Sequence, residues 1–267
     1  MPGPPAYGHR VDAEQRVWAR LPTGTADAVA ALPGSDLTTV LLGVARERAA
    51  RVRPADVMRR WRADRLVRPA AADPRRVSRV EARLWELLPP EFDGVELSPV
   101  VPLGTCTAVT PAGQDRIVSG MRPVEVLSDP TNALAVEAAA RRGRGPVHLA
   151  ACHRVLRAQP FAPGMSQHFR LFALVSSGRD DNLLKIHLDY WRRVLDDLLP
   201  QGRLEIQGPR GYYVGPALKI FAGDVELGDG GFTTWTAQLR GDAKQRCLTS
   251  CLATERLTSL IEPGLGH

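Results

Sequence analysis

The chain has 267 residues, of which 44% are hydrophobic, 24% charged and 6% aromatic, and its formal net charge is +6. This composition excludes a wholly disordered or collagen-like chain, and no apolar run approaches the roughly 18 residues of a membrane span. The opening residues lack the apolar core of a secretory signal. Four cysteines in a chain this long do not form a disulfide scaffold, so we expect a reducing, cytoplasmic environment and no membrane partner.

Positive charge is concentrated in one segment. Residues 46–79 contain twelve arginines and four acidic residues, an excess of eight positive charges that leaves the rest of the chain at −2. Such a patch favours contact with nucleic acid phosphates or with an acidic partner such as a carrier protein. A solvated surface is the simpler alternative, because only three of the 35 basic residues are lysines and arginine is the general solubilising cation of this chain.

The first 73 residues are predicted to form a leader and a basic helical segment. Pro, Gly and Ala dominate residues 1–35 and predict a loose leader. Asp36 is placed to cap a helix over residues 36–51, and Pro54 to open a second helix over 55–67. The two helices fit either a helix-turn-helix or a small cap on the main domain. We therefore expect residues 1–73 to be separate from a larger domain of residues 74–267.

The larger domain has the pattern of a mixed α and β fold. Helices are predicted where apolar residues recur at helical spacing, over 77–88, 132–142 and 182–199, with a further helix-like segment over 247–260. Strands are predicted over 95–101, 147–156, 169–175, 204–206, 212–221 and 224–227. Strands joined by short loops, with helices grouped between them, favour an α+β antiparallel sheet over a βαβ array.

Common site signatures are missing from the sequence. It has no Gly-x-x-x-x-Gly-Lys-Ser/Thr loop, no Gly-x-Gly-x-x-Gly segment that opens a helix, and no Ser-His-Asp pattern. The cysteines and His153 do not have the spacing of a structural zinc site. Any nucleotide is therefore held in another way.

Three segments, in chain order, resemble the three signature motifs of class II aminoacyl-tRNA synthetases. The helix 77–88 with the strand ending at Pro99 resembles motif 1, which forms the dimer interface of that family. Residues 157–159, Arg-Ala-Gln, and 167–169, Gln-His-Phe, resemble motif 2, in which an Arg-x-Glu strand turns back into a strand with a Phe. Residues 251–257, Cys-Leu-Ala-Thr-Glu-Arg-Leu, resemble motif 3, usually Gly-x-Gly-x-Glu-Arg-Leu.

The resemblance implies a site for ATP and Mg²⁺. Arg157 is expected to stabilise charge on the α-phosphate, and Arg256 to orient the pyrophosphate. Phe169 is expected against the adenine, with Phe172 of the same strand as a nearly equal candidate. Further residues expected around the nucleotide are Gln159, which replaces the family Glu, His168, Glu226, Asp229 and Glu255, with Glu226 as the candidate Mg²⁺ ligand. A solvated strand edge is the alternative for Glu226 or Asp229.

Two further stretches are similar to histidyl-tRNA synthetase. Residues 210–215, Arg-Gly-Tyr-Tyr-Val-Gly, resemble a shortened Arg-Gly-Leu-Asp-Tyr-Tyr-x-Gly signature, and residues 230–233 stand where that family has Gly-Gly-Arg-Tyr-Asp. The Asp and the Arg that help to hold histidine are absent here, so histidine is not expected as the substrate. The candidate substrate residues are Asp129, Thr131, Asn132, Arg210, Tyr212 and Tyr213. A helix N-cap explains residues 129–132 equally well, and only one of the two tyrosines can line a pocket.

The resemblance covers residues 75–260 and implies the class II synthetase core, an antiparallel sheet flanked by helices that is expected to form a homodimer. Eleven residues follow Arg256, so no C-terminal anticodon-binding domain is expected. The implied function is ATP-dependent activation of an amino acid or related carboxylate as an acyl-adenylate, for transfer to an amine, a carrier protein or a tRNA.

Two alternatives to this ligase remain. A non-catalytic paralogue, like the regulatory subunit of ATP phosphoribosyltransferase, is favoured by the lost motif 2 Glu and motif 3 glycines. The retained Arg157 and Arg256 favour the enzyme. Nucleic-acid binding through residues 36–68 is the other alternative, and it depends on charge alone.

Overall fold

The computed structural model describes residues 8–110, 113–141, 145–162, 165–179 and 182–261. The chain divides into two compact units, residues 1–54 with 121–123 and residues 55–120 with 124–267. The boundary between them falls at the start of the second basic helix, whereas the sequence alone predicts it at residue 73. No helix in the described part of the chain is long and apolar enough to cross a membrane.

The described residues of the N-terminal unit form three helices, α1 (Gly8–Trp18), α2 (Thr25–Ala30) and α3 (Gly34–Ala50). The prediction of a loose leader is therefore wrong for residues 8–30. Alanine is the strongest helix former, and Gly24 supplies the left-handed turn, at a φ of 83°, that precedes α2. In α3 the N-cap is Pro33, and Asp36 lies in the first turn of the helix. No residue of α2 or α3 is buried.

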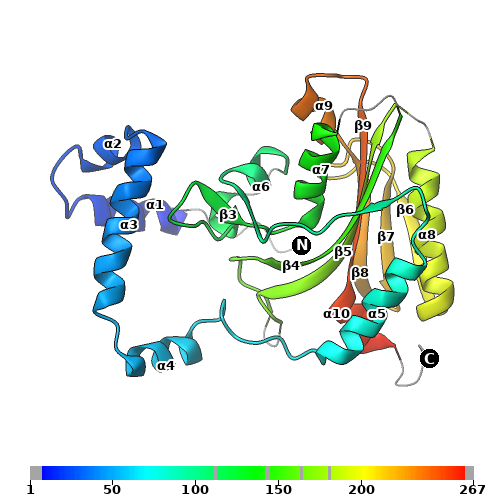
Figure 1. The fold of residues 1–267 in the computed structure, drawn as a ribbon, viewed down its shortest axis with the longest axis horizontal. Coiled ribbons are helices and arrows are strands. Elements are labelled where there is room, and N and C mark those ends of the chain that lie inside the picture. Colours follow the sequence, from blue (N-terminus) through cyan, green and yellow to red (C-terminus); the bar gives the residue numbers. More distant parts are fainter. Residues whose placement is uncertain (1–7, 111–112, 142–144, 163–164, 180–181, 262–267) are drawn as a thin grey trace. The chain divides into compact units, whose positions relative to one another are not determined.

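The larger unit is built on a mainly antiparallel sheet (Figure 1). Within the described residues, seven strands follow the order β1, β4, β5, β9, β8, β7, β6, and only the pair β1–β4 is parallel. Their bounds are Asp93–Gly94, Val147–Leu156, His168–Gly178, Arg246–Ala253, Val225–Thr233, Ala217–Ala222 and Gly202–Gln207. A separate pair joins β2 (Val100–Pro102) to β3 (Val124–Val126). The predicted α+β class and antiparallel sheet are confirmed.

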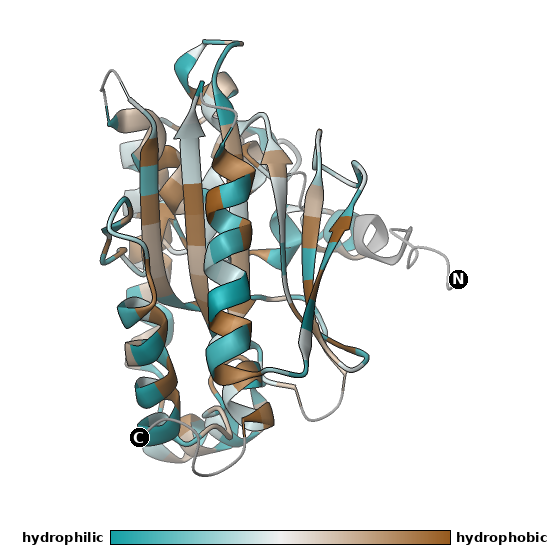
Figure 2. Ribbon diagram, turned by 90° about the vertical axis from the view of Figure 1, so that its right-hand side faces the viewer, coloured by the Kyte–Doolittle hydropathy of each residue, from teal (hydrophilic) through white to brown (hydrophobic). Residues whose placement is uncertain are grey.

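One face of the sheet is covered by α8 (Leu183–Leu198), with α5 (Pro74–Glu86) and α10 (Thr254–Leu260) at one end. Figure 2 shows α8 lying across this face with alternating hydrophobic and hydrophilic bands. Phe172 of β5 lies there against Tyr190 and Trp191 of α8, and all three are fully buried. The Tyr190 hydroxyl donates to the Leu84 carbonyl of α5 at 2.9 Å. These contacts attach two helices to one side of the sheet.

The opposite face is covered by α7 (Pro130–Ala140) and α9 (Trp235–Arg240) (Figure 1). Small side chains allow α7 to lie close to the sheet, because Ala135 and Ala138 pack on Ala151 and Ala173, and all four are fully buried. The short helix α6 (Thr105–Ala108) and a 3₁₀ turn (Gln114–Arg116) precede α7 in the chain. This face of the sheet is therefore fully buried where α7 packs on it.

Several element boundaries differ from the sequence prediction. Residues 247–253 form strand β9 and not a helix. Because β9 lies in the middle of the sheet, both of its faces are buried, and its sequence does not alternate as a half-exposed strand does. The predicted strand over 95–101 is reduced to β2, the strand over 212–221 begins at Ala217, and β8 extends to Thr233. Helix α4 (Pro54–Ala63) ends four residues before the predicted limit of 67.

Candidate active site

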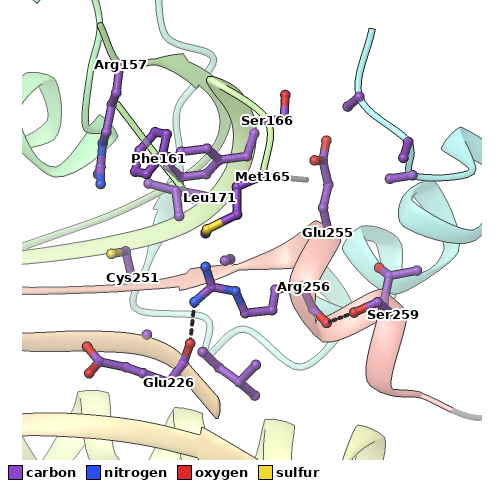
Figure 3. Close-up of a pocket in the computed structure, with 18 of the residues that line it drawn as sticks. Arg157, Phe161, Met165, Ser166, Leu171, Glu226, Cys251, Glu255, Arg256 and Ser259 are labelled. Carbon is purple, nitrogen blue, oxygen red and sulfur yellow. Dashed lines mark hydrogen bonds between the residues drawn. The ribbon is translucent and has the colours of Figure 1, made fainter. Parts of the chain in front are cut away.

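A cavity of about 790 Å³ lies on the sheet at the ends of β5, β8 and β9 (Figure 3). Its walls come from parts of the larger unit that are far apart in the sequence. They are the loop between β4 and β5, the start of α10, the segment before α7 and the linker residues 70–73. Such a concave site, lined by both apolar and charged groups, is the usual form of a small-molecule pocket.

Arg157 enters this cavity directly after strand β4. Its Nε donates to the Ser128 carbonyl at 2.9 Å, and its Nη2 donates to Asp129 Oδ2 at 3.2 Å. The guanidinium carbon lies 5.1 Å from the centre of the Phe169 ring, so the cation stacks over the aromatic face. These three contacts fix Arg157 while its remaining N–H donors are available to a ligand.

Arg256 enters the same cavity from the first turn of α10, directly after β9. Its Nη1 donates to the backbone carbonyl of Glu226 on β8, as Figure 3 shows. Antiparallel pairing of β5 with β9 places Ala253 opposite Leu171, and both line the cavity. The sheet therefore brings Arg157 and Arg256 to one cavity.

The two glutamates around the cavity are engaged with basic side chains. Glu226 pairs with Lys219 of the neighbouring strand, and Glu255 pairs with Arg154. Both glutamates nevertheless line the cavity beside Arg256. Among the described residues there is no group of three or more His, Cys, Asp or Glu side chains arranged to hold a metal ion. Mg²⁺ would therefore depend on one or two carboxylates together with ligand phosphates, which is its usual mode in nucleotide sites.

Asp229 lines the cavity with Asp129, Tyr212 and Cys251. Burial raises the pKa of Asp229, and the negative charges of Asp129 and Glu226 raise it further. Burial and the negative charges of Asp129 and Asp229 raise the pKa of the Cys251 thiol. This thiol is therefore neutral and is not a nucleophile. This part of the cavity is acidic, in contrast with the part that contains Arg157 and Arg256.

Alternation along two segments decides which predicted residues reach the cavity. Phe169 lines it, whereas Phe172 lies in the core on the opposite face of the sheet. His168 also lies on the far face, where its ring nitrogens contact Arg154 at 2.8 Å and the Arg68 carbonyl at 2.7 Å. Tyr212 lines the cavity, and Tyr213 is buried behind it.

The remaining predicted residues lie outside the cavity lining. Gln159 uses its backbone carbonyl to accept a hydrogen bond from Arg65 at 3.1 Å. Thr131 and Asn132 are buried in the first turn of α7, which Asp129 caps by accepting from the Thr131 N–H at 3.0 Å. Arg210 is exposed and donates to Gln207 at 2.8 Å. The N-cap alternative therefore describes Thr131 and Asn132 best.

Sequence reasoning missed the linker that crosses the β4–β5 loop. Arg65 donates to the Ala158 carbonyl at 2.6 Å and to Gln167 Oε1 at 3.0 Å, so it ties both ends of the loop together. Beyond it, Ala70, Ala71, Ala72 and Asp73 line the cavity, as does Arg76 of α5. A run of alanines carries no functional signal, and the arginine excess of this region concealed Arg65, which contacts the loop.

Comparison with solved structures identifies the fold. Pyrrolysyl-tRNA synthetase from Desulfitobacterium hafniense is 15% identical, with a TM-score of 0.55 over 75% of this chain and 72% of that chain. An ATP phosphoribosyltransferase regulatory subunit/histidyl-tRNA synthetase from Bacillus halodurans is 11% identical, with a TM-score of 0.56 over 73% of this chain and 83% of that one. No protein-family model matches this sequence, and neither does any curated protein. The chain has the fold of class II aminoacyl-tRNA synthetase catalytic cores.

Proposed function

We propose that the protein activates a carboxylate, most simply that of an amino acid, as an acyl-adenylate at the expense of ATP. The observation that carries this proposal is the convergence of Arg157 and Arg256 on one cavity, with Phe169 beside them. Two guanidinium groups and an aromatic face suit a triphosphate attached to a purine. The fold of the synthetase cores supports the proposal.

In the proposed reaction, a carboxylate oxygen attacks the α-phosphorus of ATP. The bond from this phosphorus to the bridging oxygen breaks, and pyrophosphate leaves with the bonding electron pair. Arg157 stabilises the negative charge that develops on the α-phosphate, and Arg256 holds the leaving pyrophosphate. Glu226 and Glu255 are the residues that would hold Mg²⁺, which supplies further positive charge against the phosphates. The step requires no covalent nucleophile from the protein.

The acyl group then passes to an acceptor, for which we propose an amine, a carrier protein or a tRNA end. Helix α4 offers a basic surface for such a partner, since Arg59, Arg60 and Arg62 are exposed next to Trp61, which is 49% exposed. We also propose a homodimer through α5 and the following segment, by similarity to motif 1. Analytical sedimentation, which measures the oligomeric state, would test the homodimer. Binding of a tRNA that is unchanged when the charges of Arg59, Arg60 and Arg62 are reversed would exclude the α4 surface.

Pyrophosphate exchange into ATP, with a panel of amino acids, tests the reaction directly. We expect exchange with at least one acid, and Arg157→Ala should abolish it without unfolding the protein. Removal of one donor to a developing charge lowers kcat by about 10²–10³-fold. Arg210→Ala is the matched control, because this exposed arginine lies outside the cavity. Unchanged exchange in Arg157→Ala would remove its assigned role, and failure of the wild-type protein to bind ATP would end the proposal.

A non-catalytic paralogue is the second candidate function. Cys251 and Ala253 stand where motif 3 has glycines, and both line the cavity. Arg157 is already paired with Asp129, and Arg256 with the Glu226 carbonyl. One of the similar structures carries the description of a regulatory subunit. Ligand binding without exchange for any acid would favour this candidate over the ligase.

A further inference from the structure

The linker, residues 64–73, leads from helix α4 to helix α5 and precedes the segment that resembles the synthetases. The structure describes all of its residues, and they form neither helix nor strand. The last four of them, residues 70–73, nevertheless form part of the wall of the cavity. A segment without regular secondary structure keeps such a place only if contacts with the rest of the protein hold it.

Arg65 makes the first of these contacts, at the β4–β5 loop. Its Nη1 donates to the Gln159 carbonyl at 3.1 Å and to Gln167 Oε1 at 3.0 Å. Its Nη2 donates to the Ala158 carbonyl at 2.6 Å. Residues 158 and 159 follow strand β4, whereas the buried Gln167 directly precedes strand β5. One planar guanidinium therefore joins the two ends of the loop.

The residues that Arg65 joins are the neighbours of the two cavity groups Arg157 and Phe169. Arg157 directly precedes Ala158, and its backbone N–H donates to the Gln167 carbonyl at 2.9 Å. Phe169 follows Gln167 by two residues along the chain, and its ring lies 5.1 Å from the Arg157 guanidinium carbon. A shift of either end of the loop would therefore move the cation and the aromatic ring relative to each other.

His168 attaches the linker at a second point. Its Nδ1 lies 2.8 Å from the guanidinium of Arg154, which can only donate, so Nδ1 accepts. In the neutral ring Nε2 then carries the proton and donates to the Arg68 carbonyl at 2.7 Å. The motif residue that does not reach the cavity thus holds the linker beside the loop that Arg65 joins.

We propose that Arg65 is a positioning residue for the activation step, because it joins the ends of the β4–β5 loop and so keeps Arg157 and Phe169 in place for ATP. The inference rests on the proposed function and makes the linker part of the site. Arg65 does not line the cavity, so it acts through the loop and not by contact with the substrate. Its shape matters more than its charge, because three acceptors at fixed places suit a planar fork of donors.

The test compares Arg65→Ala and Arg65→Lys with the wild type. In Arg65→Ala we expect kcat for pyrophosphate exchange to fall roughly 10- to 100-fold and the KM for ATP to rise, because a small misplacement of reacting groups has effects of this size. Hydrogen–deuterium exchange of the amides of residues 157–159 and 167–169 should become faster without any ligand. The urea midpoint should stay the same, since Arg65 lies at the surface. Arg65→Lys, which keeps the charge without the fork, should resemble Arg65→Ala.

The matched control is Arg46→Ala, which removes the same charge from an exposed position of α3 and should change none of these quantities. Wild-type kinetics or wild-type amide exchange in Arg65→Ala would overturn the inference, as would full activity in Arg65→Lys. A fall of the urea midpoint in step with the activity would assign Arg65 to the fold and also overturn it. If the wild type exchanged pyrophosphate with no acid, the proposed function would fail, and calorimetric ATP binding with the amide exchange would still decide the role of Arg65.

Discussion

The two faces of the central sheet are made by the same strands but serve different ends. On the α8 face, Phe172, Tyr190 and Trp191 are fully buried, and the polar groups among them are hydrogen-bonded. On the cavity face, Phe169 is only partly buried beside Arg157. The difference indicates that the first face stabilises the fold, whereas the part of the second face around Phe169 and Arg157 lines the cavity. Substitutions on the two faces should therefore have separable effects.

The largest separation is expected from two phenylalanines of β5. Phe172→Ala should lower the free energy of unfolding by about 3–5 kcal/mol, because it leaves a cavity in the core. Phe169→Ala should leave stability nearly unchanged and raise the KM for ATP, since stacking of a base on an aromatic ring contributes about 1–3 kcal/mol. Urea unfolding and exchange kinetics on both variants measure this. Equal losses of stability would contradict the division between the faces.

Arg256→Ala tests the cavity face through charge. We expect kcat for exchange to fall about 10²–10³-fold, because a donor to the leaving pyrophosphate is lost. Stability should fall by about 1 kcal/mol or less, since among the described residues the Arg256 side chain makes a single hydrogen bond, to the Glu226 carbonyl. Arg240→Ala, at the exposed end of α9, is the control. If the loss of unfolding free energy were as large as the loss of activity expressed as a free energy, the role of Arg256 would be structural.

How far the sequence predicts the molecule depends on whether an element has one buried face or two. Helix α8 has a clear pattern of apolar and polar residues, and its bounds match the expectation closely. Strand β9 is buried on both faces, so its pattern carries no period and the helix prediction for residues 247–253 failed. Apolar and polar residues follow a regular period only where one face of an element is exposed, so a fully buried element shows no such period.

The residues of the candidate site also divide into those that the sequence predicts and those that it does not. Arg157, Arg256 and Phe169 were identified by resemblance to motifs, and all three line the cavity. His168 is adjacent to Phe169 in the motif, yet a strand directs neighbouring side chains to opposite faces, so both could not reach the nucleotide. The contact of Arg65 with the β4–β5 loop spans about a hundred residues of sequence, and no local pattern encodes it.

The smallest effect concerns a chain of buried polar groups on the α8 face. His187 is fully buried, and its ring nitrogens contact Ser176 at 2.9 Å and Ser250 at 2.8 Å. His148 contacts the other side of Ser176 at 2.7 Å. Burial, with a smaller contribution from His148, lowers the pKa of His187 from 6.5 to about 3. The neutral ring is therefore the form that the core accommodates.

The unfolded chain binds a proton at His187 below pH 6.5, and the folded protein does so only near pH 3, so stability should decline as pH falls between these values. The loss should be on the order of 1 kcal/mol at pH 5.5. Urea unfolding across this range measures it, and His187→Gln, which keeps hydrogen-bonding groups without titrating, should reduce the dependence. A pH dependence identical in the variant would show that other groups cause it. Exchange kinetics of His187→Gln at neutral pH should match the wild type, because this histidine lies on the face opposite the cavity.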